Sequence, residues 1–376
     1  MLDKADESRG TSHTVASAVK LWTDSTPSSD DARTTEVYRS YILRKIFFVV
    51  LCVGIAFIMS GLALTQGPYD IGFWETYGII WDHITGNVLN KIRDYVVWDV
   101  RLPRIVAGLI AGAGLAAAGA TMQSVLKNPL ADPYTTGISS GALFGATLSI
   151  TMRLTLVAGN YGTVINAFVF SLIPTMAIVA ISKMKSSSPT TMVMAGIAVM
   201  YIFNAFTTVM KLWSDPSALS DLYRWQVGTL VNIVWTDLPL MIGFTIAGVI
   251  ALQVVSRKLN VLAMGDDNAK SLGVNAERLR VSCLIMVALI TASIVSFTGL
   301  IGFVGLVVPH IVRLFIGPDN RYLIPASVMF GAAFLVMADL IGRTVFPFNL
   351  EVGAVTAFIG GPMFLYLIVR RKNNTW

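Results

Sequence analysis

Long apolar stretches without a charged residue recur along most of the chain and are separated by short polar segments. They lie at residues 46–69, 105–126, 154–182, 186–210, 281–309, 322–338 and 352–369. A helix needs about 20 apolar residues to cross the hydrocarbon layer of a bilayer, and only helices or closed barrels satisfy the backbone there. Because the stretches lack the alternation of barrel strands, they predict an all-α polytopic membrane protein.

The apolar runs and the helix breakers between them predict about ten transmembrane helices. We place these helices near residues 43–65, 102–125, 134–157, 161–182, 191–212, 236–256, 279–298, 304–316, 322–343 and 352–370. The run 281–309 contains Gly299, Gly302 and Gly305, so we expect it to break into two helices around these glycines. Residues 42–372 are therefore predicted to form a single transmembrane domain.

The start of the chain has a different composition, with Ser, Thr, Asp and scattered charges, as in DSTPSSDDARTTE. Such a segment cannot bury enough apolar surface to offset its chain entropy, so residues 1–41 are predicted to be a disordered polar tail in the cytoplasm. The first apolar run begins too late for a secretory signal and is long enough to span.

The overall composition agrees with a membrane protein, since 55% of the residues are hydrophobic and only 13% are charged. The net charge of +6 does not point to a nucleic-acid partner, because the basic residues lie between the spans rather than on one soluble face. Lys and Arg concentrate in the loops on the side of both termini. The positive-inside rule then places both termini in the cytoplasm of a multi-pass inner-membrane protein embedded in the lipid bilayer.

Three arginines lie against this charge bias, on the predicted outer side: Arg101, Arg104 and Arg343. Any one of them alone can be explained by a side chain that reaches a lipid headgroup. Together they indicate an outer surface that attracts anions. Asp339, the one acid placed clearly inside a span, lies four residues before Arg343, which favours a local ion pair over a proton relay.

The chain lacks the residue patterns of an enzyme. It has no Gly-Lys dipeptide, so it contains no phosphate-binding loop of the Gly-Lys-Ser/Thr kind. The three histidines are scattered without metal-ligand spacing, and Cys52 and Cys283 are interpreted as packing residues inside spans. We therefore predict no catalytic, cofactor-binding or metal site, and energy for any uphill movement must come from another subunit.

The longest and most charged inner loop is SRKLNVLAMGDDNAKSLGVNAERLR, residues 256–280. Its middle fits one short helix with Gly265 and Gly273 as possible ends. Composition leaves two interpretations open: a solvated connector, or a docking element for a cytoplasmic partner.

Several long motifs make the resemblance to a known family specific. They are RLPRIVAGLIAGAGLAAAGATMQSVLKNPLADPYTTGISSGA, MGDDNAKSLGV, GFVGLVVPHIVRLFIGPDNRYLIPASVMFGAAFLVMADLIGR and VGAVTAFIGGPMFLYLIVRR. The motifs stand in the order of a known family, and the match runs from about residue 42 to 372. The chain resembles the permeases of binding-protein-dependent ABC importers for iron-siderophores, haem and vitamin B12. The resemblance implies the type II ABC importer permease fold, a homodimeric pore, two ATPase subunits that bind ATP and Mg, and an extracytoplasmic substrate-binding protein.

The resemblance also implies roles for individual residues. Arg101, Arg104 and Arg343 would dock on carboxylates of the binding protein, for which the guanidinium offers a bidentate fork. The coupling segment at about 258–276 would contact the ATPase through Gly265, Ala269, Leu272 and Gly273. The inner gate would comprise Asn128, Pro129 and Leu130 and, by a looser match, Ser188, Pro189 and Thr190.

The fifth span resembles the helix that lines the transport pathway. Val193, Ile197, Met200, Asn204, Thr208 and Lys211 share one face by helical periodicity. A stripe facing lipid or another helix would show the same spacing. The chain departs from the family at Glu351, where proline is usual, which raises the possibility of a pair between Glu351 and Arg343, and in GGP at 360–362, where GAP is commoner.

An ion-gradient-driven secondary transporter is the alternative function. It would require buried carboxylates or broken half-helices around a site at the membrane midplane. Asp339 is its only candidate acid in this sequence.

Overall fold

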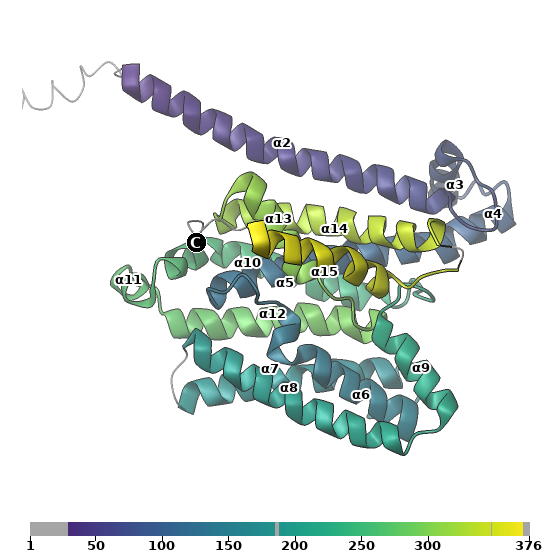
Figure 1. Cartoon of the computed structure of the whole chain (residues 1–376). Helices are drawn as coiled ribbons and strands as arrows, with labels where there is room; N and C mark the ends of the chain where they lie inside the picture. Colours follow the sequence, from purple (N-terminus) through teal and green to yellow (C-terminus); the bar gives the residue numbers. More distant parts are fainter. Residues whose placement is uncertain (1–28, 185–187, 347, 371–376) are drawn as a thin grey trace, which may run out of the picture. The chain divides into compact units, whose positions relative to one another are not determined.

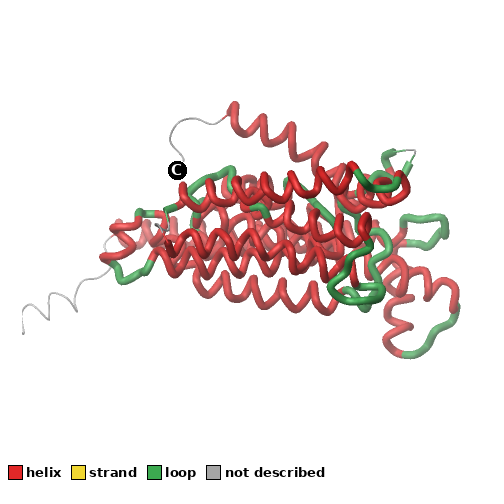
Figure 2. The backbone as a smooth tube through the Cα atoms, turned by 90° about the horizontal axis from the view of Figure 1, so that it is seen from below, coloured by secondary structure: helices red, strands yellow, loops and turns green. Residues whose placement is uncertain are grey.

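The computed structural model describes residues 29–184, 188–346 and 348–370. The chain divides into two compact units, Met1–Phe47 and Phe48–Trp376. The described residues form helices joined by loops and turns, and none of them is in a strand (Figure 2). The all-α fold class is therefore confirmed for this part of the chain.

The first helix, α2, runs from Ser29 to Thr65. In the order of Figure 1 it is followed by α3 (Phe73–Thr85), α4 (Lys91–Tyr95), α5 (Leu102–Val125), α6 (Ile138–Met152), α7 (Gly162–Met184), α8 (Pro189–Leu212), α9 (Pro216–Val227), α10 (Leu238–Ala263), α11 (Asp266–Ser271), α12 (Ala276–Thr298), α13 (Val304–Ile316), α14 (Asn320–Thr344) and α15 (Val352–Arg370). A π-helical turn over Val96–Arg101 joins α4 to α5, and a 3₁₀ turn over Pro133–Thr136 precedes α6.

Seven helical segments among the described residues are long and apolar enough to cross a membrane. They are Ile42–Thr65, Lys91–Val125, Gly162–Met184, Pro189–Leu212, Leu238–Ala263, Ala276–Thr298 and Asn320–Thr344. Three shorter apolar helices, Ile138–Met152, Val304–Ile316 and Val352–Tyr366, lie where the remaining spans were predicted. A polytopic membrane protein is confirmed, with three elements shorter than a full crossing normally requires.

The predicted disordered tail needs a correction. Residues 1–28 lie outside the described residues, but residues 29–41 are helical rather than disordered, because α2 begins at Ser29. No proline or glycine interrupts the sequence between Ser29 and Gly54. Once a helix is nucleated in an apolar span, adding each further residue is far less costly than starting a new helix, so α2 extends into the polar sequence.

The predicted break in the run 281–309 is confirmed. Helix α12 ends at Thr298, Gly299 follows with a φ of +69°, and Phe303 has a φ of +68° before α13 begins at Val304. The prediction missed α3, α4 and α9, which are too short and too polar on one face to resemble spans. Local signals mark two of them: Pro216 stands at the start of α9, and Gly86 ends α3 in the left-handed region.

Helix α5 lies in the core of the second unit and packs against α10, α12, α13 and α14. Almost all of its residues from Ile105 to Val125 are buried, and most of these are Ala or Gly. Gly112 faces the backbone of Gly331 in α14, and Gly119 faces the backbone of Gly305 in α13. Small residues let backbones approach closely where lipid supplies no hydrophobic drive, so the packing interpretation of this segment is confirmed.

Two ends of the helix array in the second unit carry the predicted functional segments. Helix α11 lies at one end, and α3, α4 and α9 lie at the other (Figure 1). We call the first the α11 end. The second, which holds the start of α5 and the last turn of α14, is called the arginine end after Arg101, Arg104 and Arg343.

Candidate functional site

At the arginine end, Arg104 and Arg343 share one acid. Arg104 donates from Nε to both carboxylate oxygens of Asp339 at 3.1 and 3.2 Å, and from Nη2 to Oδ1 at 2.7 Å. Arg343 Nη2 lies 3.0 Å from Asp339 Oδ2. The Asp339 side chain is only 3% exposed, whereas Arg104 is 19% and Arg343 is 12% exposed. The predicted local pair between Asp339 and Arg343 is confirmed, and the pair that Arg343 makes is with Asp339 and not with Glu351.

Arg101 points into the protein and holds the end of α2. Its guanidinium donates to the carbonyl oxygens of Leu64, Thr65 and Tyr69 at 2.5, 3.1 and 2.6 Å. The residue is 5% exposed. The last carbonyls of a helix lack partners within the helix and carry partial negative charge, so a buried arginine is stabilised there. This geometry does not support Arg101 as a direct docking contact, since the residue is buried and its guanidinium already donates three hydrogen bonds inside the chain.

The arginine cluster, defined as Arg101, Arg104, Arg343 and Asp339, retains excess positive charge because it holds three guanidiniums and one carboxylate. Arg343 Nη1 donates to the Ala63 carbonyl at 3.3 Å. Its buried Nε and Nη2 donate no aligned hydrogen bond within the described residues, although Nη2 is close to Asp339. A carboxylate approaching this end would therefore meet a net positive charge and the partly exposed guanidinium of Arg104.

At the α11 end, the predicted short helix is confirmed. Helix α11 is flanked by Gly265, with a φ of +121°, and Gly273, with a φ of +77°, a region that favours glycine. Leu272 is 62% exposed and available to a partner, whereas Ala269 is fully buried. The Ala269 side chain faces the protein and packs α11 in place, and contact of this residue with an ATPase stays a prediction.

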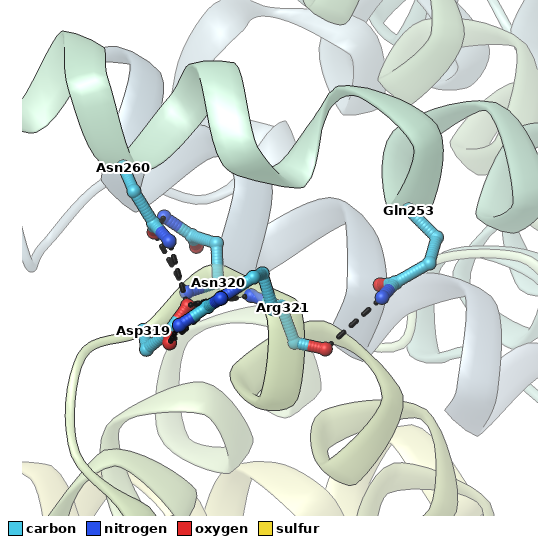
Figure 3. A network of polar contacts seen from close by, with 5 residues as sticks. All are labelled: Gln253, Asn260, Asp319, Asn320 and Arg321. Carbon is cyan, nitrogen blue, oxygen red and sulfur yellow. Dashed lines mark hydrogen bonds and ion pairs between the residues drawn. The ribbon is translucent and has the colours of Figure 1, made fainter. Parts of the chain in front are cut away.

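A polar network beside α11 was missed by the sequence analysis (Figure 3). Asn260, near the end of α10, donates to Asp319 Oδ1 at 2.6 Å and accepts from the backbone of Asn320 at 2.8 Å. The Arg321 guanidinium donates from Nε and Nη2 to Asp319 Oδ2 at 3.0 and 2.6 Å. Gln253 donates to the Arg321 carbonyl at 3.0 Å. Burial opposes ionisation of Asp319, but the hydrogen bonds from Arg321 and Asn260 outweigh it and lower its pKa. The network fastens the end of α10 that leads into α11 to the start of α14.

Part of this network carries a sequence signal. Asp319 precedes α14 as its N-cap and accepts from the backbone N–H of Arg321 at 3.1 Å. An Asp-Asn pair just before a predicted span is typical of a helix start. Nothing in the sequence indicates that Asn260 meets it, because that pairing depends on how α10 and α14 pack.

The predicted inner-gate residues have local structural roles. Asn128 Oδ1 accepts from the backbone N–H of Leu130 at 3.0 Å and stabilises the turn after α5. Ser188 caps α8 by accepting from the N–H of Thr191 at 3.1 Å, with Pro189 in the first helical position. These contacts explain the residue types at both turns without a gate, so the gating role stays a prediction.

Half of the predicted stripe on α8 is uncovered by the rest of the chain. Ile197, Asn204 and Thr208 are exposed, and Val193, Met200 and Lys211 are half-buried. An adjacent face of α8 packs inward through residues such as Met192 and Phe203. The exposed members of the stripe therefore do not face a helix of the same chain, which leaves lipid, a second copy or a transport pathway. Lys211 donates to Gln226 of α9 at 3.2 Å.

No group of three or more His, Cys, Asp or Glu residues is placed to hold a metal ion within the described part of the chain. His83 has a structural setting: its Nδ1 lies 2.8 Å from Asp94 Oδ1, and its ring stacks on Trp98 at 3.9 Å between centroids. Cys52 and Cys283 are buried free cysteines.

An array of apolar helices, with a basic cluster at one end and a short helix flanked by two glycines at the other, is typical of a polytopic membrane protein. Residues 47–370 match the FecCD transport family. The chain belongs to this family, as its motifs indicated.

Named relatives agree with this assignment. The chain is 40% identical over 278 residues to the cobalamin import system permease protein of Halobacterium salinarum, covering 74% of each chain. It is 33% identical over 333 residues to the Fe(3+)-citrate import system permease protein of Bacillus subtilis, covering 88% of this chain and 96% of the relative. It is 33% identical over 316 residues to the hemin transport system permease protein of Yersinia pestis, covering 83% and 93%.

A solved structure described as an inward-facing metal-chelate type ABC transporter has a similar fold. The TM-score is 0.76 with 26% identity, covering 86% of this chain and 99% of the other. These relatives are permease components of transport systems, and none of them supports the alternative of an ion-gradient-driven transporter.

Proposed function

We propose that this chain is the membrane permease of a binding-protein-dependent ABC importer for an iron chelate, haem or a corrinoid. The observation that carries the proposal is the family match over residues 47–370, together with relatives named for cobalamin, Fe(3+)-citrate and hemin. Two copies would form the pore, and two separate ATPase subunits would bind ATP and Mg. An extracytoplasmic protein would deliver the ligand.

The orientation of the proposed importer places the arginine end outside and the α11 end in the cytoplasm. The bias of Lys and Arg toward loops on the side of the termini supports this orientation. In this arrangement the three shorter apolar helices complete ten crossings of the inner membrane, and both termini are cytoplasmic.

Docking of the binding protein is assigned to Arg104 and Arg343, with Arg101 as a positioning residue. The partial exposure of Arg104 and Arg343, at 19% and 12%, supports this division, because Arg101 is only 5% exposed. Arg101 would act indirectly, because it fixes the end of α2 beside the cluster.

Contact with the ATPase is assigned to α11 through Leu272 and the backbone at Gly265 and Gly273, while buried Ala269 anchors the helix. ATP binding would draw the two ATPases together, and α11 would carry that movement to the inner gate. The gate comprises the turns at Asn128–Leu130 and Ser188–Thr190 in this proposal. The stripe on α8 would line the pathway between two copies, since its members Ile197, Asn204 and Thr208 are exposed in one chain.

Transport by the assembled complex is expected to depend on ATP on the α11 side. Vesicles containing the chain, its ATPase and its binding protein would be supplied with the ligand that the binding protein retains. Uptake should fall to background when ATP is omitted and should persist when ionophores dissipate ion gradients. Uptake that continues without ATP and collapses with ionophores would contradict the proposal and favour the secondary transporter.

A further inference from the structure

One acid at the α11 end joins three segments of the chain. Asp266, the first residue of α11, accepts at Oδ1 from Lys127 Nζ at 3.0 Å and from Arg280 Nη2 at 2.6 Å. Lys127 follows α5, and Arg280 belongs to α12. The start of α11 is therefore tied by charge to the ends of two long helices.

Arg280 makes one side of this junction rigid. It is only 2% exposed, and its Nε also approaches the carbonyl of Val125, the last residue of α5, at 3.4 Å. A buried guanidinium is strongly disfavoured without its anionic partner. The hydrogen bond from Arg280, with further help from Lys127, lowers the pKa of Asp266 to about 2. Asp266 is thus charged throughout the physiological pH range, and the contact persists.

Lys127 extends the junction to the turn that holds Asn128, Pro129 and Leu130. Its φ of +50° is unusual for a residue with a side chain. The next residue, Asn128, donates from its backbone to the Gln123 carbonyl at 3.2 Å and accepts from Leu130 through its side chain. Because the turn is internally bonded, a displacement of Lys127 must carry the whole turn with it.

We propose that the Asp266 junction transmits the movement of α11 to the turn after α5, with Lys127 as the positioning residue that makes the connection. The inference rests on the proposed function, in which α11 contacts the ATPase. It assigns a role to Lys127, Asp266 and Arg280 that contact with the ATPase alone does not require. The pair between Lys127 and Asp266 is partly exposed, so it contributes little to stability and can be removed while the fold is kept.

The test compares Lys127→Met with Lys183→Met in the complete complex with ATPase and binding protein. Lys183 is an exposed lysine in the last turn of α7 with no ion pair among the described residues, so its replacement changes the charge equally. We expect the complex with Lys127→Met to keep its ATPase rate but to transport about fivefold or more fewer ligand molecules per ATP hydrolysed. Lys183→Met should keep the ratio of the unmodified protein.

Chemical rescue separates charge from shape. In Lys127→Cys, alkylation with 2-bromoethylamine before assembly restores an ammonium at nearly the original length, whereas iodoacetamide adds a neutral group. The native Cys52 and Cys283 are 2% and 0% exposed and should not react. We expect the ratio of transport to hydrolysis to recover with 2-bromoethylamine only.

Three results would contradict the proposed role of the Asp266 junction. The first is an unchanged ratio of transport to ATP hydrolysis in Lys127→Met, and the second is a loss of hydrolysis and uptake in equal proportion. The third is equal recovery of the ratio in Lys127→Cys with both reagents. These outcomes differ from failure of the proposed function, in which the unmodified protein itself would transport without ATP.

Discussion

Asp339→Asn is expected to lower the free energy of unfolding by about 3 kcal/mol, because it leaves the mostly buried guanidiniums of Arg104 and Arg343 without their counter-charge. Asp339 is the acid that both arginines contact, and it is 3% exposed. Denaturation in mixed micelles would measure the change. Asp221→Asn, at an exposed position of α9, removes the same charge and should alter stability by no more than about 0.5 kcal/mol.

A triple variant separates stability from docking. Replacing Arg104, Asp339 and Arg343 together with leucine removes the charges as a set, and such replacements of buried ion pairs are often neutral or stabilising. This variant should recover most of the stability lost in Asp339→Asn and yet bind the binding protein more weakly. If Asp339→Asn were as stable as the unmodified protein, the contacts of Asp339 with Arg104 and Arg343 would not contribute to stability as their burial implies.

Gly119→Ala is expected to destabilise the protein by about 3 kcal/mol or more, at the upper end of overpacking effects. A Cβ at this position would overlap the carbonyl of Gly305, which is backbone and cannot swing aside. The helix propensity of alanine returns only about 1 kcal/mol. Thermal unfolding of the purified chain, followed by loss of its monodisperse peak, would measure the effect.

Gly243→Ala provides the matched control. Gly243 lies in the interior of α10, and a Cβ there would meet no atom within 4 Å. This variant should be neutral or stabilised by up to about 1 kcal/mol. If Gly119→Ala were as stable as Gly243→Ala, the close packing of α5 on α13 at Gly119 and Gly305 would be contradicted.

The positions of the apolar helices could be predicted from sequence because membrane insertion depends on a local property, the length of an uncharged run. The break at Gly299–Phe303 followed from the same kind of local reading. Residues 29–41 were mispredicted because a helix can extend past the apolar run that nucleates it. Helices α3, α4 and α9 were missed because they are short and polar on one face, so they contain no apolar run of the length of a span.

The contacts of the candidate sites could not be predicted, because they depend on packing between distant segments. Arg104 and Asp339 are separated by 235 positions in the sequence. The family motifs pointed to Arg101 and Ala269, but motifs do not state which way a side chain faces. In the structure both side chains point into the protein: Arg101 donates to backbone carbonyls, and Ala269 packs α11 against the rest of the chain.

Labelling of introduced cysteines tests the central claim, that the arginine end is outside and the α11 end is in the cytoplasm. Leu89 is 92% exposed near the start of α4, and Leu272 is 62% exposed at the end of α11. In intact cells or spheroplasts, a membrane-impermeant maleimide should label Leu89→Cys, and it should label Leu272→Cys only after permeabilisation. Labelling of Leu272→Cys from outside, with Leu89→Cys protected, would place the α11 end outside and the arginine end in the cytoplasm. That result would contradict the proposed sides of ligand delivery and ATP hydrolysis.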